Sequence, residues 1–220
     1  RREAALAARL AYGVLQNRAL LDFYLGQYCA QPFEKLEPFI RDVLRLGGYQ
    51  ILYMDRVPDS AAVDEAVKTV KRKKRQRAAG LVNAVLRRMS REKGSLPALP
   101  AEDRAAYLSL RCSHPRWLVE RFLELLGGEE AEELLRANNG SVPTVIQRNP
   151  LKCTAEELHA RLEESGAALA PHPWMPDCCL LSGGGELEAM PAFREGLFQV
   201  QDAAAKAAVL AAGPRPGTRM

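Results

Sequence analysis

The chain has 220 residues, of which 47% are apolar and 26% are charged, with a net charge of +4. Such a composition is typical of one or two globular domains, and it excludes a collagen, a disordered tail and a disulfide-rich miniprotein. No segment approaches 18 consecutive apolar residues, so we expect no membrane partner. The first residues lack the apolar region of a secretory signal, and we expect the chain to be a fragment of a longer protein.

The cysteines predict reduced thiols in a cytoplasmic protein, because they are odd in number, scattered and without C-x-x-C spacing. Cys178 and Cys179 follow Asp177 in a strand-like segment, which indicates inert thiols rather than a nucleophile. The three histidines show none of the spacings of zinc ligands. We therefore expect no metal site.

Charge is unevenly distributed along the chain. Residues 1–128 hold 23 Lys and Arg against 14 Asp and Glu, whereas residues 129–195 hold 5 against 12. Residues 68–77 contain seven basic side chains and no acidic one, more than intrahelical ion pairs could use, so the pattern predicts a polyanion such as RNA as partner. The alternative for this segment is a solvated helix end, the usual role of a run of charges. For Arg87, Arg88 and Arg91 the alternative is that helix C-termini favour basic residues. The candidate RNA-binding residues are Lys68, Lys71, Arg72, Lys73, Lys74, Arg75, Arg77, Arg87, Arg88 and Arg91.

The first 128 residues show only helical periodicity. Apolar stripes of period 3.6 predict helices over about residues 6–23, 34–52, 61–72, 79–91 and 117–126, with a further capped helix from Glu102. Residues 73–77 form the expected exposed loop between two of these helices. Gly47 and Gly48 lie inside a predicted helix, where glycine is unfavourable, so we expect a neighbouring helix to pass close to them.

From Asn138 onward the pattern becomes mixed. Residues 142–148, 178–181 and 197–200 have strand propensity, and Thr154 with Glu157 has the spacing of a capping box. An acidic helix over 129–137 precedes this region, and an alanine-rich helix over 202–212 follows it. The predicted fold class is therefore mainly α, with an all-helical domain followed by a small α+β subdomain.

Several blocks of sequence resemble a known family. Residues 10–22, 44–53 and 80–88 resemble the all-helical NusB-like RNA-binding domain. Residues 113–121, 137–139, 147–152 and 196–203 resemble the linker and early catalytic region of bacterial 16S rRNA (cytosine-C5) methyltransferases of the Sun/Fmu (RsmB) type. The blocks occur in the family's order and cover nearly the whole chain.

The resemblance implies three parts: a NusB-like domain over residues 1–128, a linker helix with a small RRM- or ferredoxin-like subdomain over 129–200, and a helix over 201–220 that leads into a Rossmann-like domain. It implies a cytoplasmic parent enzyme that uses S-adenosylmethionine to methylate 16S rRNA. The family's first helix would precede Arg1, and its cofactor loop and catalytic cysteines would follow Met220. We expect this chain to bind 16S rRNA, to contain no catalytic residue and to bind no S-adenosylmethionine.

Two other functions remain open from the residues alone: a NusB-like transcription antitermination factor without catalysis, and a helical scaffold whose basic face confers solubility. The α+β region favours the methyltransferase, because an antitermination factor would end near Gly128. Salt-dependent RNA binding would exclude the scaffold.

Individual polar and aromatic residues receive structural interpretations. We expect Asn83 to satisfy buried backbone groups, and Trp117 to pack in a core with Phe122 because both lie on one apolar stripe. His114, before a proline, indicates a turn. Asp202 is compatible with an N-cap or with a place near the cofactor domain of the resembled family.

Overall fold

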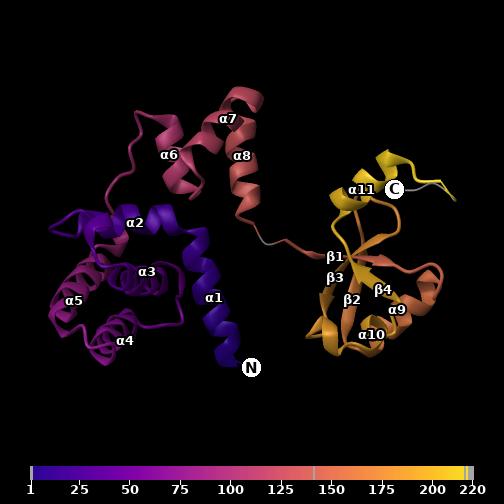
Figure 1. Ribbon diagram of the computed structural model, residues 1–220, viewed down its shortest axis with the longest axis horizontal. Helices are drawn as coiled ribbons and strands as arrows, with labels where there is room; N and C mark the ends of the chain where they lie inside the picture. The colour runs from indigo at the N-terminus through magenta and orange to yellow at the C-terminus, as the bar shows by residue number, and fades with distance from the viewer. Residues whose placement is uncertain (1, 141, 216, 218–220) are drawn as a thin grey trace. The chain divides into compact units, whose positions relative to one another are not determined.

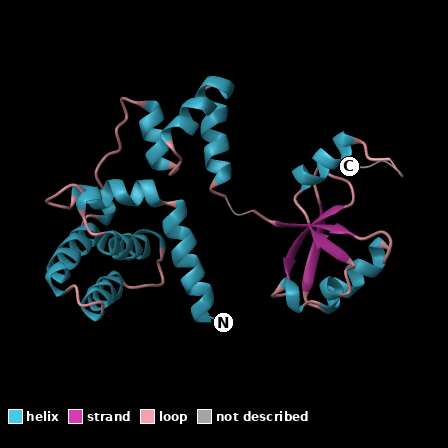
Figure 2. Cartoon of the chain, viewed as in Figure 1, coloured by secondary structure: helices cyan, strands magenta, loops and turns pink. Residues whose placement is uncertain are grey.

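The computed structural model describes residues 2–140, 142–215 and 217 (Figures 1 and 2). The chain divides into two compact units, residues 1–140 and residues 141–220. The first unit is helical, and its α-helices are α1 (Arg2–Gln16), α2 (Arg18–Gln27), α3 (Pro38–Tyr53), α4 (Asp59–Arg72), α5 (Gln76–Arg91), α6 (Arg104–Arg111), α7 (Arg116–Leu126) and α8 (Gly128–Asn138). Short 3-10 helices lie at Phe33–Lys35 and Lys93–Ser95.

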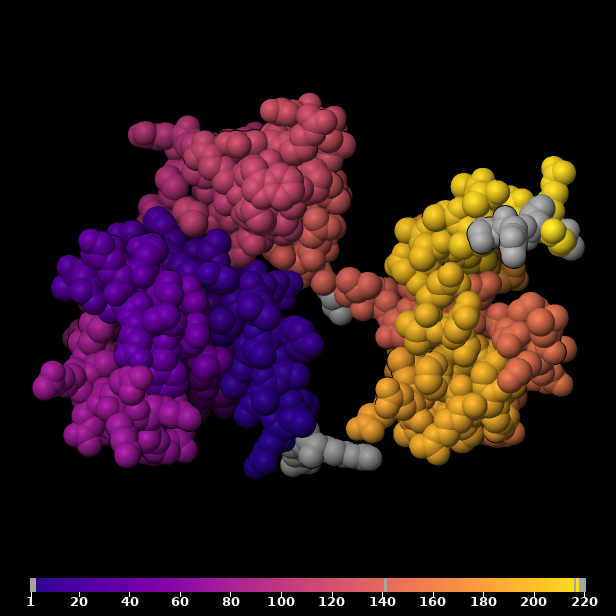
Figure 3. Space-filling model, in the orientation of Figure 1, coloured from indigo at the N-terminus to yellow at the C-terminus, as the bar shows by residue number. Residues whose placement is uncertain are grey.

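Helices α2 to α5 enclose the larger core of the first unit. Its fully buried side chains include Leu21, Leu25, Leu44, Ile51 and Leu86. A Cβ atom at Gly47 would lie 2.5 Å from Leu86 Cδ1, which confirms the expected close approach between α3 and α5. Helix α1 packs on α3, and its other side is exposed along most of its length (Figure 3).

Helices α6, α7 and α8 form a smaller core in the same unit, built on Leu108, Val119 and Leu135. Because α8 buries Leu135 in this cluster, the structure divides the chain after Gly140, one helix later than the boundary expected at residue 128. The acidic part of the chain begins with α8, but the packing of the apolar side of this helix groups it with the preceding helices.

The second unit is a small α+β fold. Its elements are β1 (Thr144–Arg148), α9 (Ala155–Glu164), β2 (Ala167–Pro171), β3 (Cys178–Gly183), a 3-10 helix (Leu187–Ala189), α10 (Pro191–Arg194), β4 (Phe198–Val200) and α11 (Ala203–Ala212). The strands form one antiparallel sheet in the order β2-β3-β1-β4, with Ile146 opposite Cys179 on one side and Val200 on the other. The order β-α-β-β-α-β is that of ferredoxin-like folds, which confirms the predicted class.

Both faces of the sheet are covered. Leu158 and Leu162 of α9 pack with Ile146 and Phe198 on one face. On the other face, Ala203 of α11 packs with strand residues. The Lys206 ammonium is nearly buried and donates to the Pro176 carbonyl at 2.8 Å, which ties α11 to the loop before β3.

The expected elements differ from the structure at several boundaries. The predicted helix over 6–23 is interrupted at Asn17, and the one over 34–52 begins only at Pro38. The expected loop over 73–77 is a turn of three residues, because Gln76 already begins α5. Strand β2 was not predicted. None of the described helices is both long and apolar enough to cross a membrane.

Candidate nucleic-acid interface

All ten predicted RNA-binding side chains lie on α4, α5 or the turn between them, and all are exposed. The two helices pack side by side, and Ser90 Oγ near the end of α5 donates to Asp59 Oδ2 at the start of α4, 2.8 Å away, so they run antiparallel (Figure 1). The basic residues therefore separate into two groups at opposite ends of this helical hairpin. The turn group is Lys68, Lys71, Arg72, Lys73, Lys74, Arg75 and Arg77. The end group is Arg87, Arg88 and Arg91.

The turn group is only partly neutralised by neighbouring acids. Arg75 Nε donates to both carboxylate oxygens of Glu37, at 2.8 and 3.1 Å, and Arg72 pairs with Glu65. Lys74 has a positive φ of 59°, which lets the chain reverse within three residues. The side chains without an ion pair or hydrogen bond to any described residue are Lys68, Lys71, Lys73, Lys74 and Arg77. Five cations therefore remain available to a polyanion.

Two members of the end group are held by hydrogen bonds. Arg87 Nε donates to Asn83 Oδ1 at 2.8 Å, and Arg88 Nε donates to Glu92 Oε1 at 3.0 Å. The guanidinium of Arg88 also lies over the ring of Tyr28, 5.2 Å from its centroid. The prediction that Asn83 satisfies buried backbone groups was wrong: its side chain is only half-buried and orients an arginine.

Small residues separate the two basic groups on α5. Arg77, Gly80, Ala84, Arg88 and Arg91 recur at helical spacing and share the exposed face. A Cβ atom at Gly80 would meet nothing within 4 Å, so this glycine serves no packing contact in the described structure. At 1.5 Å per residue, Arg77 and Arg88 lie about 16 Å apart along the helix. This face of α5 thus has cations at both ends and only small residues, Gly80 and Ala84, between them.

Four of the cysteine thiols are poor nucleophiles, and the described residues contain no group of metal ligands. Burial raises the pKa of the thiols of Cys29, Cys112, Cys153 and Cys179, which keeps them protonated and poorly nucleophilic. Among the residues that the structure describes, no three His, Cys, Asp or Glu side chains are grouped as metal ligands would be.

The run of three glycines at 183–185 does not fit S-adenosylmethionine. Such a cofactor needs a glycine turn that leads into a helix, but this run is followed by a 3-10 helix of three residues. A Cβ atom at Gly184 would lie 2.2 Å from Met190 Cε and 2.8 Å from Ala167 Cβ, so the turn packs against its own domain. In the described structure these glycines form a tight connection after β3.

The structure contradicts one of the remaining residue predictions and confirms two. Trp117 was expected in a core but is 68% exposed, because α7 turns Val119 and Phe122 inward instead. His114 is confirmed as a turn residue, with Nδ1 2.7 Å from the Cys112 carbonyl. Asp202 is confirmed as an N-cap, since its carboxylate accepts the Ala204 N–H at 2.8 Å.

Comparison with known families identifies both units. Residues 1–91 match the NusB family, and residues 114–188 match the ferredoxin-like domain of RsmF/B-like methyltransferases. The chain is thus a NusB domain joined to an RsmF/B-type ferredoxin-like domain, which confirms the resemblance found in the sequence.

Individual relatives agree with this assignment. The chain is 32% identical to ribosomal RNA small subunit methyltransferase B of Klebsiella pneumoniae strain MGH 78578 over 219 residues, which is 100% of the chain and 49% of that protein. It is 31% identical to the probable ribosomal RNA small subunit methyltransferase B of Bacillus subtilis strain 168, over 96% of the chain and 46% of that protein. The chain spans about half the length of the curated relatives it matches.

A solved structure shows the same fold. The crystal structure of PH0851 matches 97% of this chain and 47% of its own, with a TM-score of 0.72 and 22% identity. In this chain the match to the ferredoxin-like domain of RsmF/B-like methyltransferases follows the match to the NusB family.

Proposed function

We propose that this chain is the RNA-recognition portion of a methyltransferase that uses S-adenosylmethionine to methylate C5 of a cytosine in 16S rRNA. The observation that carries the proposal is the set of exposed, unpaired cations on the α4–α5 hairpin, in a NusB domain joined to an RsmF/B-type domain. The relatives' names support a ribosomal RNA substrate. Cofactor binding and methyl transfer belong to the parent protein, which acts in the cytoplasm where ribosomes assemble.

The role of the hairpin follows from the physics of polyanions. Each phosphate that a Lys or Arg neutralises releases a condensed counterion, which makes binding favourable at low salt and weak at high salt. A cation that is already paired with a carboxylate contributes less to this effect. We therefore assign the phosphate contacts to the unpaired members of the turn group and to Arg87 and Arg91 of the end group. Arg72, Arg75 and Arg88, which are each paired with a glutamate, contribute less.

The first experiment measures binding of 16S rRNA fragments to this chain at several salt concentrations. Replacing Lys73, Lys74 and Arg77 together by Ala should flatten the slope of log K against log salt by about two to three units, since each phosphate contributes roughly 0.7 to 0.9. The matched control replaces Arg18, Arg121 and Arg136 by Ala, which removes the same charge from exposed positions outside the hairpin. Equal effects of the two triple variants would contradict the proposed interface.

The second experiment tests the chemistry in the parent protein. The parent with labelled S-adenosylmethionine and undermethylated 16S rRNA should yield 5-methylcytosine, detected by nucleoside mass spectrometry. The parent with the hairpin triple variant should show a raised KM for RNA, because the substituted side chains bind RNA at a distance from the reacting base. Absence of 5-methylcytosine with the unmodified parent would overturn the methyltransferase assignment while leaving RNA binding by this chain intact.

A further inference from the structure

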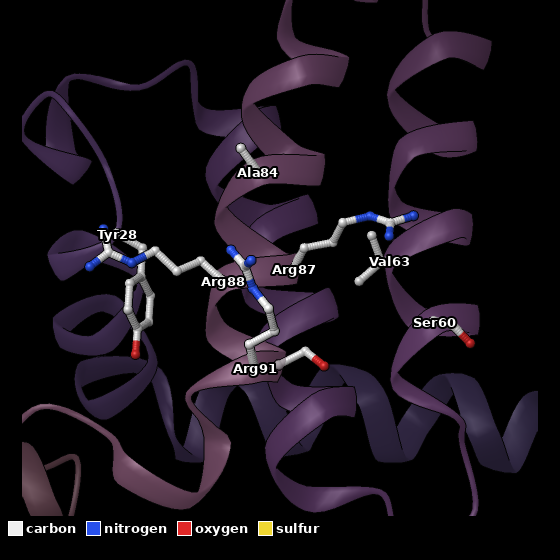
Figure 4. A pocket seen from close by; sticks show the side chains of 8 residues that line it. Tyr28, Ser60, Val63, Ala84, Arg87, Arg88 and Arg91 are labelled. Carbon is white, nitrogen blue, oxygen red and sulfur yellow. The ribbon is translucent and has the colours of Figure 1, made fainter.

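A hollow of about 570 Å³ lies between the start of α4 and the last turns of α5, beside the end group (Figure 4). Ser60, Ala84 and Ser90 contribute short side chains to its lining. The residues that line it are Tyr28, Ser60, Val63, Ala84, Arg87, Arg88, Ser90 and Arg91. None of these described lining residues is acidic.

The charges around the hollow leave a surplus of positive potential. Glu92 is engaged by Arg88, and Asp59 accepts from Ser90 and lies 3.8 Å from the Lys93 ammonium. Arg91 forms no ion pair or hydrogen bond with a described residue, and Arg87 is bonded only to the neutral Asn83 side chain. An anion in the hollow would therefore meet Arg87 and Arg91, which have no ion pair with a described carboxylate, and Arg88, which uses its Nε for Glu92.

Two of the arginines are oriented in advance. Arg87 and Arg88 each use Nε for a bond to a residue four positions away on the same helical segment, which sets the plane of the guanidinium and leaves the terminal nitrogens free. Tyr28, which is 9% exposed, packs its ring against the guanidinium of Arg88. Figure 4 shows Arg88 directed toward Tyr28, Arg87 toward Val63, and Arg91 between them. Little side-chain entropy remains to be lost when an anion binds.

We propose that this hollow binds the phosphate backbone of RNA, with phosphate oxygens accepting bonds from Arg87, Arg88 and Arg91 and the adjoining ribose lying against Ala84. Planar guanidinium groups recognise phosphate oxygens through paired hydrogen bonds, which lysines cannot reproduce. The volume exceeds that of one phosphate group, which leaves space for the sugar. This assignment rests on the proposed function for the identity of the polyanion, and adds a defined point at which the RNA is held.

Filling the hollow without changing charge tests the inference. Ala84→Leu keeps a good helix former at an exposed position and occupies the space beside the arginines. We expect it to weaken binding of a 16S rRNA fragment about tenfold at constant salt, the effect of losing a charge-assisted hydrogen bond. The control Ala160→Leu adds the same bulk to an exposed helical alanine of the second unit and should leave binding within twofold.

Two further measurements separate this site from general charge attraction. Arg91→Lys keeps the charge and should weaken binding about fivefold, whereas Lys73→Arg in the turn group should change it less than twofold. Titration of the chain with inorganic pyrophosphate should shift the guanidinium NMR signals of Arg87, Arg88 and Arg91 before those of Arg72 and Arg75.

The outcomes test the phosphate site in the hollow separately from the proposed RNA interface on the α4–α5 hairpin. Unchanged RNA binding by Ala84→Leu, together with weak binding by the turn-group triple variant, would overturn the hollow as a phosphate site and leave the proposed function standing. Loss of affinity in Ala84→Leu, with its thermal unfolding unchanged, supports the inference. A short polyglutamate peptide that shifts the same signals as strongly as pyrophosphate would overturn the selectivity for phosphate.

Discussion

The hydroxyl of Ser113 accepts a hydrogen bond from the backbone N–H of Leu20, 3.2 Å away and 93 positions earlier in the chain. Leu20 lies in the first turn of α2, whose N-cap residue, Asn17, makes no capping bond with its own side chain. The turn between α6 and α7 therefore caps α2 from outside, and couples the helices after residue 100 to the NusB-type core.

Removing this hydroxyl should loosen the coupling. We expect Ser113→Ala to lower the free energy of unfolding by about 1 kcal/mol, the usual cost of losing a helix cap. Urea unfolding followed by circular dichroism measures the change. The control Ser95→Ala alters an exposed serine and should stay within about 0.5 kcal/mol. If the two variants were equally stable, the bond between Ser113 and Leu20 would contribute nothing.

The two adjacent glycines of α3 should respond in opposite ways to alanine. A Cβ atom at Gly47 would lie 2.5 Å from Leu86 Cδ1, and Leu86 is fully buried, so Gly47→Ala should cost about 1–3 kcal/mol through overpacking. At Gly48 the nearest atoms would be 3.4–3.6 Å away, an ordinary contact, so Gly48→Ala should be neutral or stabilise by up to about 1 kcal/mol. Thermal unfolding of both variants checks this, and a more stable Gly47→Ala would show that α3 and α5 pack less closely.

The pair between Arg75 and Glu37 should restrain RNA binding. Glu37→Gln removes the carboxylate that holds the Arg75 guanidinium, so Arg75 becomes free to contact a phosphate. We expect tighter binding at low salt and a salt slope steeper by roughly 0.7 to 0.9, the contribution of one phosphate. Glu156→Gln, on an exposed part of α9, removes the same charge and should leave the slope unchanged. A slope that Glu37→Gln leaves unaltered would place Arg75 outside the interface.

The stability of the α6 region should depend on pH through Asp103. The N–H of Ala106 and the Arg116 guanidinium, 3.0 and 2.8 Å from the carboxylate, lower the pKa of Asp103. A carboxyl with a lower pKa in the folded state stabilises the fold above its unfolded pKa of about 3.9, and this contribution is lost as pH falls through the folded pKa. Asp103→Ala should therefore destabilise the chain at pH 7 and much less below pH 3. Urea unfolding of both proteins across this range tests it; a pH-independent difference would contradict the pKa assignment.

Local signals predicted much of the fold because short-range interactions decide it. The capping box is present as expected: the Glu157 N–H donates to Thr154 Oγ1 at 3.2 Å, and the Thr154 N–H donates to Glu157 Oε2 at 2.8 Å. The same holds for the Asp202 N-cap. The basic residues were also placed correctly at the surface, since seven cations in ten positions cannot all be buried.

Strand β2 shows where local signals fail. Its sequence, Ala-Ala-Leu-Ala-Pro, has little strand propensity, and it becomes a strand because it pairs with β3 at the edge of the sheet, from Ala167 opposite Gly183 to Pro171 opposite Cys179. The prediction that Trp117 is buried was wrong for a related reason. Two apolar stripes overlap on α7, and only the positions of α6 and α8 decide which stripe is buried.

The sequence by itself determined that the chain is a helical basic domain followed by a small α+β domain, because periodicity, caps and charge are properties of neighbouring residues. Tertiary structure alone decided which cations are free. Glu37 reaches Arg75 across 38 positions, and the hollow among Arg87, Arg88 and Arg91 is created by Ser60 and Ala84 on two different helices. Charge pairing and empty space depend on distances between side chains that are remote in sequence, and only the folded chain sets those distances.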